Sequence, residues 1–182
     1  MSESFSYETL LAEYSCREGA IELLRQYRPY LELIPSMRRP EHSLITIPLP
    51  LVRIRRPEAT PARETVRLPC DLAIVMCDPE WKIKLGSEIL IFIHRPNEDF
   101  SDLLKRWREC QLYLDQEYEW LMPPREQHMF SEGAEEVHPL FVVLDRTPDR
   151  IKRGLAGACL PMVVRSSTVS FADEALELVD RE

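Results

Sequence analysis

The chain of 182 residues lacks several features that would assign it to a class of protein at once. No apolar run approaches the roughly 18 residues that a membrane-spanning helix needs, and residues 1–4 are polar and acidic instead of basic and then apolar. We therefore expect neither a membrane span nor a secretory leader. With only five glycines there is no glycine-rich phosphate loop, which argues against a P-loop or Rossmann nucleotide site. A serine-hydrolase elbow is also absent.

The cysteines form no recognisable framework. They are odd in number and scattered, at Cys16, Cys70, Cys77, Cys110 and Cys159. No Cys-x-x-Cys or His-x₃-His spacing occurs, so a zinc site is not expected. Cysteines set among apolar neighbours usually pack as small hydrophobic side chains in a reducing compartment. The sequence thus predicts a cytoplasmic protein without a metal or another cofactor.

Charge is spread unevenly along a chain whose formal net charge is −8. Residues 36–70 hold seven arginines and three acids, an excess of four positive charges that leaves −12 for the rest of the chain. Such a protein is not a general nucleic-acid coat, because long-range repulsion opposes phosphate binding. Arginine also suits bidentate pairing with the carboxylates of a protein partner. We expect contacts with a protein partner or nucleic acid at Arg38, Arg39, Arg53, Arg55 and Arg56.

The patterning predicts a single domain, because 45% hydrophobic and 30% charged residues are typical of a globular protein of this size. Seven prolines between residues 35 and 69 interrupt the chain, and prolines cannot donate to a strand ladder. The expected organisation is a helical segment at 1–34, a proline- and arginine-rich arm with an edge strand at 35–65, a sheet core at 66–165 and a C-terminal helix at 166–182.

Regular hydrophobic patterns predict the sheet core. Strands are expected at residues 66–77, 88–94, 140–144 and 162–165, and a further stretch of strand composition covers residues 44–55. Apolar residues spaced by three or four predict an amphipathic helix at 100–121, with Trp107 on its buried face. Strands separated by helices imply parallel crossovers, and strands without alternation imply a sheet covered on both faces. The predicted fold is α/β, with a mixed sheet, helices on both faces and the order α-β-β-β-α-β followed by a C-terminal βα extension.

Two strand segments carry a further pattern. Pro69-Cys70-Asp71 opens one apolar strand, and the next strand ends in Ile91-Phe92-Ile93-His94-Arg95 and leads into the long helix. This arrangement resembles the restriction-endonuclease-like superfamily of metal-dependent nucleases, and residues 90–114 look most like the C-terminal domains of plasmid replication-relaxation proteins. In that family the first strand supplies an Asp, and the second supplies a Glu and a Lys two residues apart.

The resemblance implies a nuclease site in which the acids hold Mg²⁺ and the Lys supports the developing charge. Asp71 matches the first acid, although Cys70 stands between it and the proline. Phe92 occupies the place of the second acid and cannot bind a cation, while His94 replaces the Lys and is largely neutral at pH 7. Departure at two of three positions predicts that hydrolysis has been lost.

Three side chains are catalytic candidates if they converge at the sheet edge, namely Asp71, His94 and Lys105. The simpler interpretation makes them a turn cap, a hydrogen-bonded strand end and a solvated side chain. We expect a non-catalytic nuclease-like module that serves as a binding or scaffold subunit of a DNA-maintenance or mobile-element complex, with a protein partner and DNA reached through the complex. Two alternatives remain: a purely structural subunit whose arm wraps a neighbour, and an active nuclease with a migrated acid.

Overall fold

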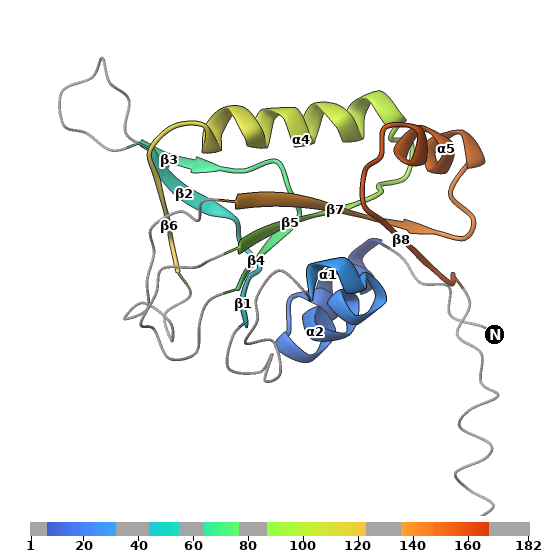
Figure 1. Cartoon of the computed structure of the whole chain (residues 1–182), viewed down its shortest axis with the longest axis horizontal. Helices are drawn as coiled ribbons and strands as arrows, with labels where there is room; N and C mark the ends of the chain where they lie inside the picture. Colours follow the sequence, from blue (N-terminus) through green and yellow to red (C-terminus); the bar gives the residue numbers. More distant parts are fainter. Residues whose placement is uncertain (1–6, 32–43, 55–63, 77–86, 123–135, 168–182) are drawn as a thin grey trace, which may run out of the picture.

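A computed structural model describes residues 7–31, 44–54, 64–76, 87–122 and 136–167 (Figure 1). Its strands form a main sheet of five strands and a small sheet of three. The main sheet contains β1 (Leu44–Ile47), β4 (Leu72–Met76), β5 (Ser87–Ile93), β7 (Glu136–Leu144) and β8 (Met162–Arg165). The small sheet contains β2 (Leu51–Ile54), β3 (Glu64–Arg67) and β6 (Tyr118–Trp120). The helices are α1 (Tyr7–Tyr14), α2 (Arg17–Gln26), the 3₁₀ turn η1 (Arg28–Tyr30), α4 (Phe100–Leu114) and α5 (Asp149–Gly157).

The main sheet is mixed, with the strand order β1-β4-β5-β7-β8. Strands β1, β4 and β5 are antiparallel neighbours, whereas β5, β7 and β8 run parallel to one another. The two parallel connections pass through α4 and α5, because a parallel crossover needs a long connection. The predicted α/β architecture with a mixed sheet and flanking helices is therefore confirmed.

Helices cover both faces of the main sheet, with α4 and α5 on one side and α1 and α2 on the other (Figure 1). Every residue of β5 is buried, and its side chains alternate between two cores. Leu90 and Phe92 pack in the core under α4 and α5, while Ile89 and Ile91 pack in the core against α1 and α2. The unbroken apolar run of β5 in the sequence therefore corresponds to a strand that is covered on both faces, as expected.

The stretch of strand composition at 44–55 divides into β1 in the main sheet and β2 in the small sheet. The predicted strand 66–77 was wrong in its continuity, because it divides into the end of β3 in the small sheet and β4 in the main sheet. Pro48 and Pro50 lie at the first break and Pro69 at the second. Because proline donates no hydrogen bond to a ladder, each break lets the chain leave one sheet and enter the other. Strand β1, which falls within the predicted arm, lies at the edge of the main sheet.

The long helix ends at Leu114 instead of Leu121, which corrects the predicted range 100–121. Asp115 closes the last turn, and the chain then forms β6, which pairs antiparallel with β2. Trp120 lies opposite Val52 in this pairing and is almost fully buried. Tyr118 and Leu121 continue the helical spacing of apolar residues, but the pairing of Tyr118 with Ile54 places it in a strand. The expected C-terminal helix at 166–182 lies almost wholly outside the described residues.

Candidate functional site

Asp71 lies immediately before β4, and its side chain is completely buried. One carboxylate oxygen, Oδ1, accepts hydrogen bonds from the Tyr7 hydroxyl at 2.5 Å and from Arg95 Nη2 at 2.9 Å. The other, Oδ2, accepts from the Ile93 backbone N–H at 2.6 Å and from Arg106 Nη1 at 3.1 Å. A buried carboxylate requires such partners, because desolvation without them would be costly. The first acid of the family pattern is therefore the centre of an ion-pair network.

Arg106 is the second centre of this network, and five oxygen atoms surround its guanidinium group. Glu98 contributes both carboxylate oxygens, at 2.7 Å from Nε and 3.1 Å from Nη2. Asp71 Oδ2 contributes a third contact, and the carbonyl oxygens of Pro69 and Ile93 lie 3.3 and 3.0 Å from the guanidinium nitrogens. Only 11% of the Arg106 side chain is exposed. The planar donor fork of arginine suits such a convergent set of oxygens.

The sequence positions Arg106 through the helix that follows β5. Asp99 and Asp102 form a capping box at the start of α4, which fixes where the helix begins. Arg106 lies less than two turns later, and its guanidinium carbon stands 5.6 Å from the centre of the Phe92 ring. Phe92 in turn stacks on Phe141 at 5.1 Å. The residue at the place of the family's second acid is therefore a fully buried part of the core.

Arg95 and Tyr7 close the network on the side of α1. The guanidinium carbon of Arg95 lies 5.5 Å from the centre of the Tyr7 ring. Burial raises the pKa of Tyr7, and its hydrogen bond to Asp71 raises the pKa further, so its hydroxyl remains a donor. Burial alone would lower the pKa of Arg95, but the hydrogen bond and charge of Asp71 outweigh it and raise that pKa. Two fixed positive charges thus balance the carboxylates of Asp71 and Glu98.

The other two catalytic candidates do not join Asp71. His94 Nε2 lies 2.8 Å from the Glu98 carbonyl oxygen, and its backbone N–H donates to Val142. Lys105 is three-quarters exposed and lies 4.0 Å from Glu109 on the outer side of α4. All three candidates belong to the described part of the chain, and no hydrogen bond or ion pair links them to one another.

Among the expected contact residues, the structure describes only Arg53, which is exposed on β2 with Nη1 3.4 Å from Glu119 Oε1. Arg38, Arg39, Arg55 and Arg56 lie outside the described residues.

Sequence reasoning missed Arg95, Arg106, Glu98 and Tyr7 as members of the site. One signal was present: Leu103, Arg106 and Cys110 recur at spacings of three and four, so Arg106 falls on the buried face of the helix. A charged residue on a buried face requires an opposite charge nearby. Tyr7 offered no comparable signal, because the contact between α1 and Asp71 joins residues 64 positions apart.

The donor set does not fit a metal ion. Within the described ranges, no group of three or more histidine, cysteine, aspartate or glutamate side chains is arranged to hold one. The oxygens of Asp71 and Glu98 instead face a guanidinium group.

None of the described helices is long and apolar enough to cross a membrane. Comparisons with protein-family models, curated proteins and solved structures found no match.

Proposed function

We propose that this chain is a restriction-endonuclease-like module that does not cleave nucleic acid, and that it acts in the cytoplasm as a binding or scaffold subunit of a DNA-maintenance or mobile-element complex. The resemblance of the two strand segments around Asp71 and Phe92 motivates the nuclease-like core. The order of elements in the main sheet is compatible with such a core, α-β-β-β-α-β. It runs from α2 through the antiparallel strands β1, β4 and β5 to α4 and the parallel strand β7.

One observation carries the non-catalytic part of the proposal: the Arg106 guanidinium lies between the carboxylates of Asp71 and Glu98. A divalent cation at this place would have to displace Arg106 from its five oxygen contacts. Arginine does not lose its proton in proteins, so the guanidinium group keeps its positive charge at this place. Arg95 adds a second positive charge on Asp71, which would repel an incoming cation.

The alternative of an active nuclease with a migrated acid makes a different use of the same geometry. Glu98 is the acid that approaches Asp71 through their shared partner Arg106. If Arg106 swung away, two carboxylates would face one cation site. Its tethering by both carboxylates and two backbone carbonyls opposes that movement, so we favour the non-catalytic function.

Calorimetric titration with Mn²⁺ and Mg²⁺, combined with cleavage assays on plasmid and linear duplex DNA, tests this function. We expect the wild-type protein to show no saturable site in the micromolar range and no cleavage. The Arg106→Ala variant is the informative comparison, because it leaves Asp71 and Glu98 without their shared cation and should gain affinity for Mn²⁺. Cation binding and cleavage by the wild-type protein, both abolished in Asp71→Asn, would establish the active nuclease instead.

A further inference from the structure

A cleft of about 560 Å³ lies at the carboxyl ends of the parallel strands β5 and β7. One wall comes from the segment between β5 and α4, which includes His94 and Asn97. The other wall comes from the segment between β7 and α5, which includes Arg146 and Arg150. In open α/β sheets, ligands bind in the crevice outside the carboxyl ends of the strands. The volume lies within the range of small-molecule sites, roughly 300–1,000 Å³.

The side chains of the cleft combine two kinds of surface. Arg146 and Arg150 supply guanidinium donors, which match the oxygens of a phosphate group. Leu144, Pro148 and Ile151 supply an apolar surface beside them. An inorganic phosphate ion would use only the first surface and a small part of the volume. The combination suits a phosphate group attached to an organic group of about the size of a nucleoside.

The acids of the cleft do not prevent an anion from binding there. The Glu98 carboxylate is engaged with Arg106, which lies outside the cleft lining. Asp99 Oδ1 lies 3.0 Å from Arg150 Nη2, but both side chains are well exposed, at 62% and 71%. An exposed ion pair contributes little net free energy, so a doubly charged phosphate competes with Asp99 for Arg150 at little cost.

We propose that this cleft binds a phosphate monoester of mononucleotide size, with the phosphate between Arg146 and Arg150 and the organic part against Leu144 and Pro148. The cleft adjoins the network around Asp71, because Tyr7 and Glu98 belong to both. The proposed phosphate contacts come from Arg146 and Arg150, so the proposal does not depend on the loss of nuclease activity. The same chemistry has two sources, a free nucleoside monophosphate or the 5′-phosphorylated end of a nucleic acid strand.

Calorimetry and ¹H–¹⁵N correlation spectra with AMP, adenosine and inorganic phosphate test the proposal on the full chain. We expect saturable binding of AMP, weaker binding of phosphate and none of adenosine. The amide signals that shift should belong to residues 94–99 and 144–151. Comparing a short oligonucleotide with and without a 5′-phosphate then identifies the source: tighter binding of the phosphorylated strand than of AMP assigns the strand end, and weaker binding assigns the free nucleotide.

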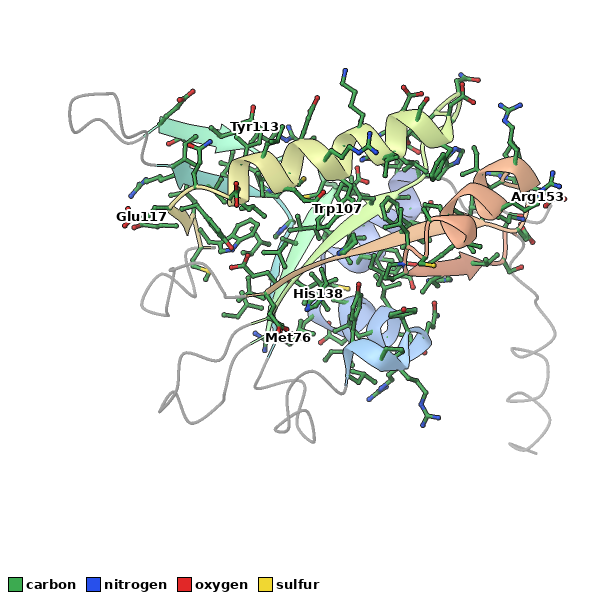
Figure 2. The ribbon with its side chains drawn as sticks, turned by 45° about the horizontal axis from the view of Figure 1, so that its top comes forward. Met76, Trp107, Tyr113, Glu117, His138 and Arg153 are labelled. Atoms are coloured by element: carbon green, nitrogen blue, oxygen red, sulfur yellow. The ribbon has the colours of Figure 1, made fainter. Side chains whose placement is uncertain are left out.

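Matched variants locate the site. Arg146→Gln combined with Arg150→Gln should weaken AMP binding by about tenfold or more, since the variant loses the charge-assisted hydrogen bonds to the phosphate. Arg153→Gln removes the same charge from an exposed position of α5 outside the cleft lining (Figure 2) and should leave the affinity unchanged. Arg150→Gln alone, at an exposed side chain, covers the case in which the double variant does not fold.

The proposal is overturned if AMP shows no saturable binding, or if Arg153→Gln weakens binding as much as Arg150→Gln does. It is also overturned if AMP shifts amide signals around Arg53 while those of residues 94–99 and 144–151 stay in place. None of these results bears on the cation titration of the wild-type protein, so failure here leaves the proposed function standing.

Discussion

At the residue scale, the ion pair of Asp71 and Arg106 links separate elements of the fold. The carboxylate of Asp71 connects α1 through Tyr7, β5 through the Ile93 backbone and α4 through Arg106. Burying these charges costs several kcal/mol of desolvation for each ion, which close pairing and further hydrogen bonds offset. The pair therefore joins three elements, and its removal should be felt as a loss of stability.

Arg106→Ala should lower the free energy of unfolding by about 3–5 kcal/mol, because it leaves Asp71 and Glu98 as buried charges without their main partner. Urea denaturation at pH 7 measures the change. Lys105→Ala, one position away on the exposed side of the same helix, should change stability by less than about 1 kcal/mol. Equal effects of the two substitutions would show that the network around Arg106 is not a stabilising contact.

A second residue-scale effect concerns Tyr14, which is buried on α1 and accepts a hydrogen bond from Arg165 Nη1 at 2.8 Å. Burial raises the pKa of Tyr14 from 10.0 to about 12, against the opposing charge of Arg165. A raised pKa in the folded state stabilises the protein below pH 10, and this contribution is lost as the pH rises from 10 to about 12.

The free energy of unfolding should therefore fall across that window by up to about 2–3 kcal/mol on account of Tyr14. The pKa values of Tyr7 and Tyr30 are also raised, so the wild-type curve alone does not isolate one group. Tyr14→Phe provides the comparison: its stability should depend less steeply on pH above 10. Parallel curves for the two proteins would mean that Tyr14 ionises as readily in the folded chain as in the unfolded one.

At the scale of elements, α4 is the helix through which the site and one core are joined. Trp107 lies on the side of α4 that faces the main sheet (Figure 2). Its ring packs edge-on against Phe92, with 6.0 Å between the ring centres, and the Arg106 guanidinium lies 5.6 Å from the centre of the Phe92 ring. Trp107→Ala should cost about 3–5 kcal/mol, the range for removing a large aromatic side chain from a core. Leu112→Ala on the same helix removes a side chain that is 69% exposed and should cost less than about 0.5 kcal/mol. Thermal denaturation of both variants tests the difference.

The same scale shows what the sequence can and cannot predict. The buried strands β5 and β7 and the start of α4 follow from unbroken apolar runs and helical periodicity, which are local properties. The position of Tyr118 does not, because its spacing fits the helix and only the pairing with Ile54 places it in β6. The site divides in the same way. Asp71 is found from its position before a strand, whereas its partner Tyr7 depends on how α1 packs across the sheet.

At the scale of the whole molecule, charge separates the two expected kinds of partner. The arginine-rich segment at residues 36–70 carries an excess of four positive charges on a chain of net charge −8. The structure describes two of its arginines, Arg53 on β2 and Arg67 on β3, and both side chains are exposed. Arg55 and Arg56 follow Arg53 closely in sequence. If the segment contacts duplex DNA, each phosphate contact should add about 0.9 to the slope of log affinity against log salt concentration.

Reversing Arg53, Arg55 and Arg56 to glutamate should then abolish DNA binding, which anisotropy with labelled duplex and single strands would measure at several salt concentrations. Reversing the exposed Arg25, Arg28 and Arg153 makes the same change in net charge elsewhere and serves as the control. We expect only weak DNA binding by the isolated chain, because the acidic remainder repels phosphate, and loss of a co-purifying protein from the first variant alone. Strong, salt-dependent DNA binding that survives the first reversal would contradict this assignment of the arginine segment.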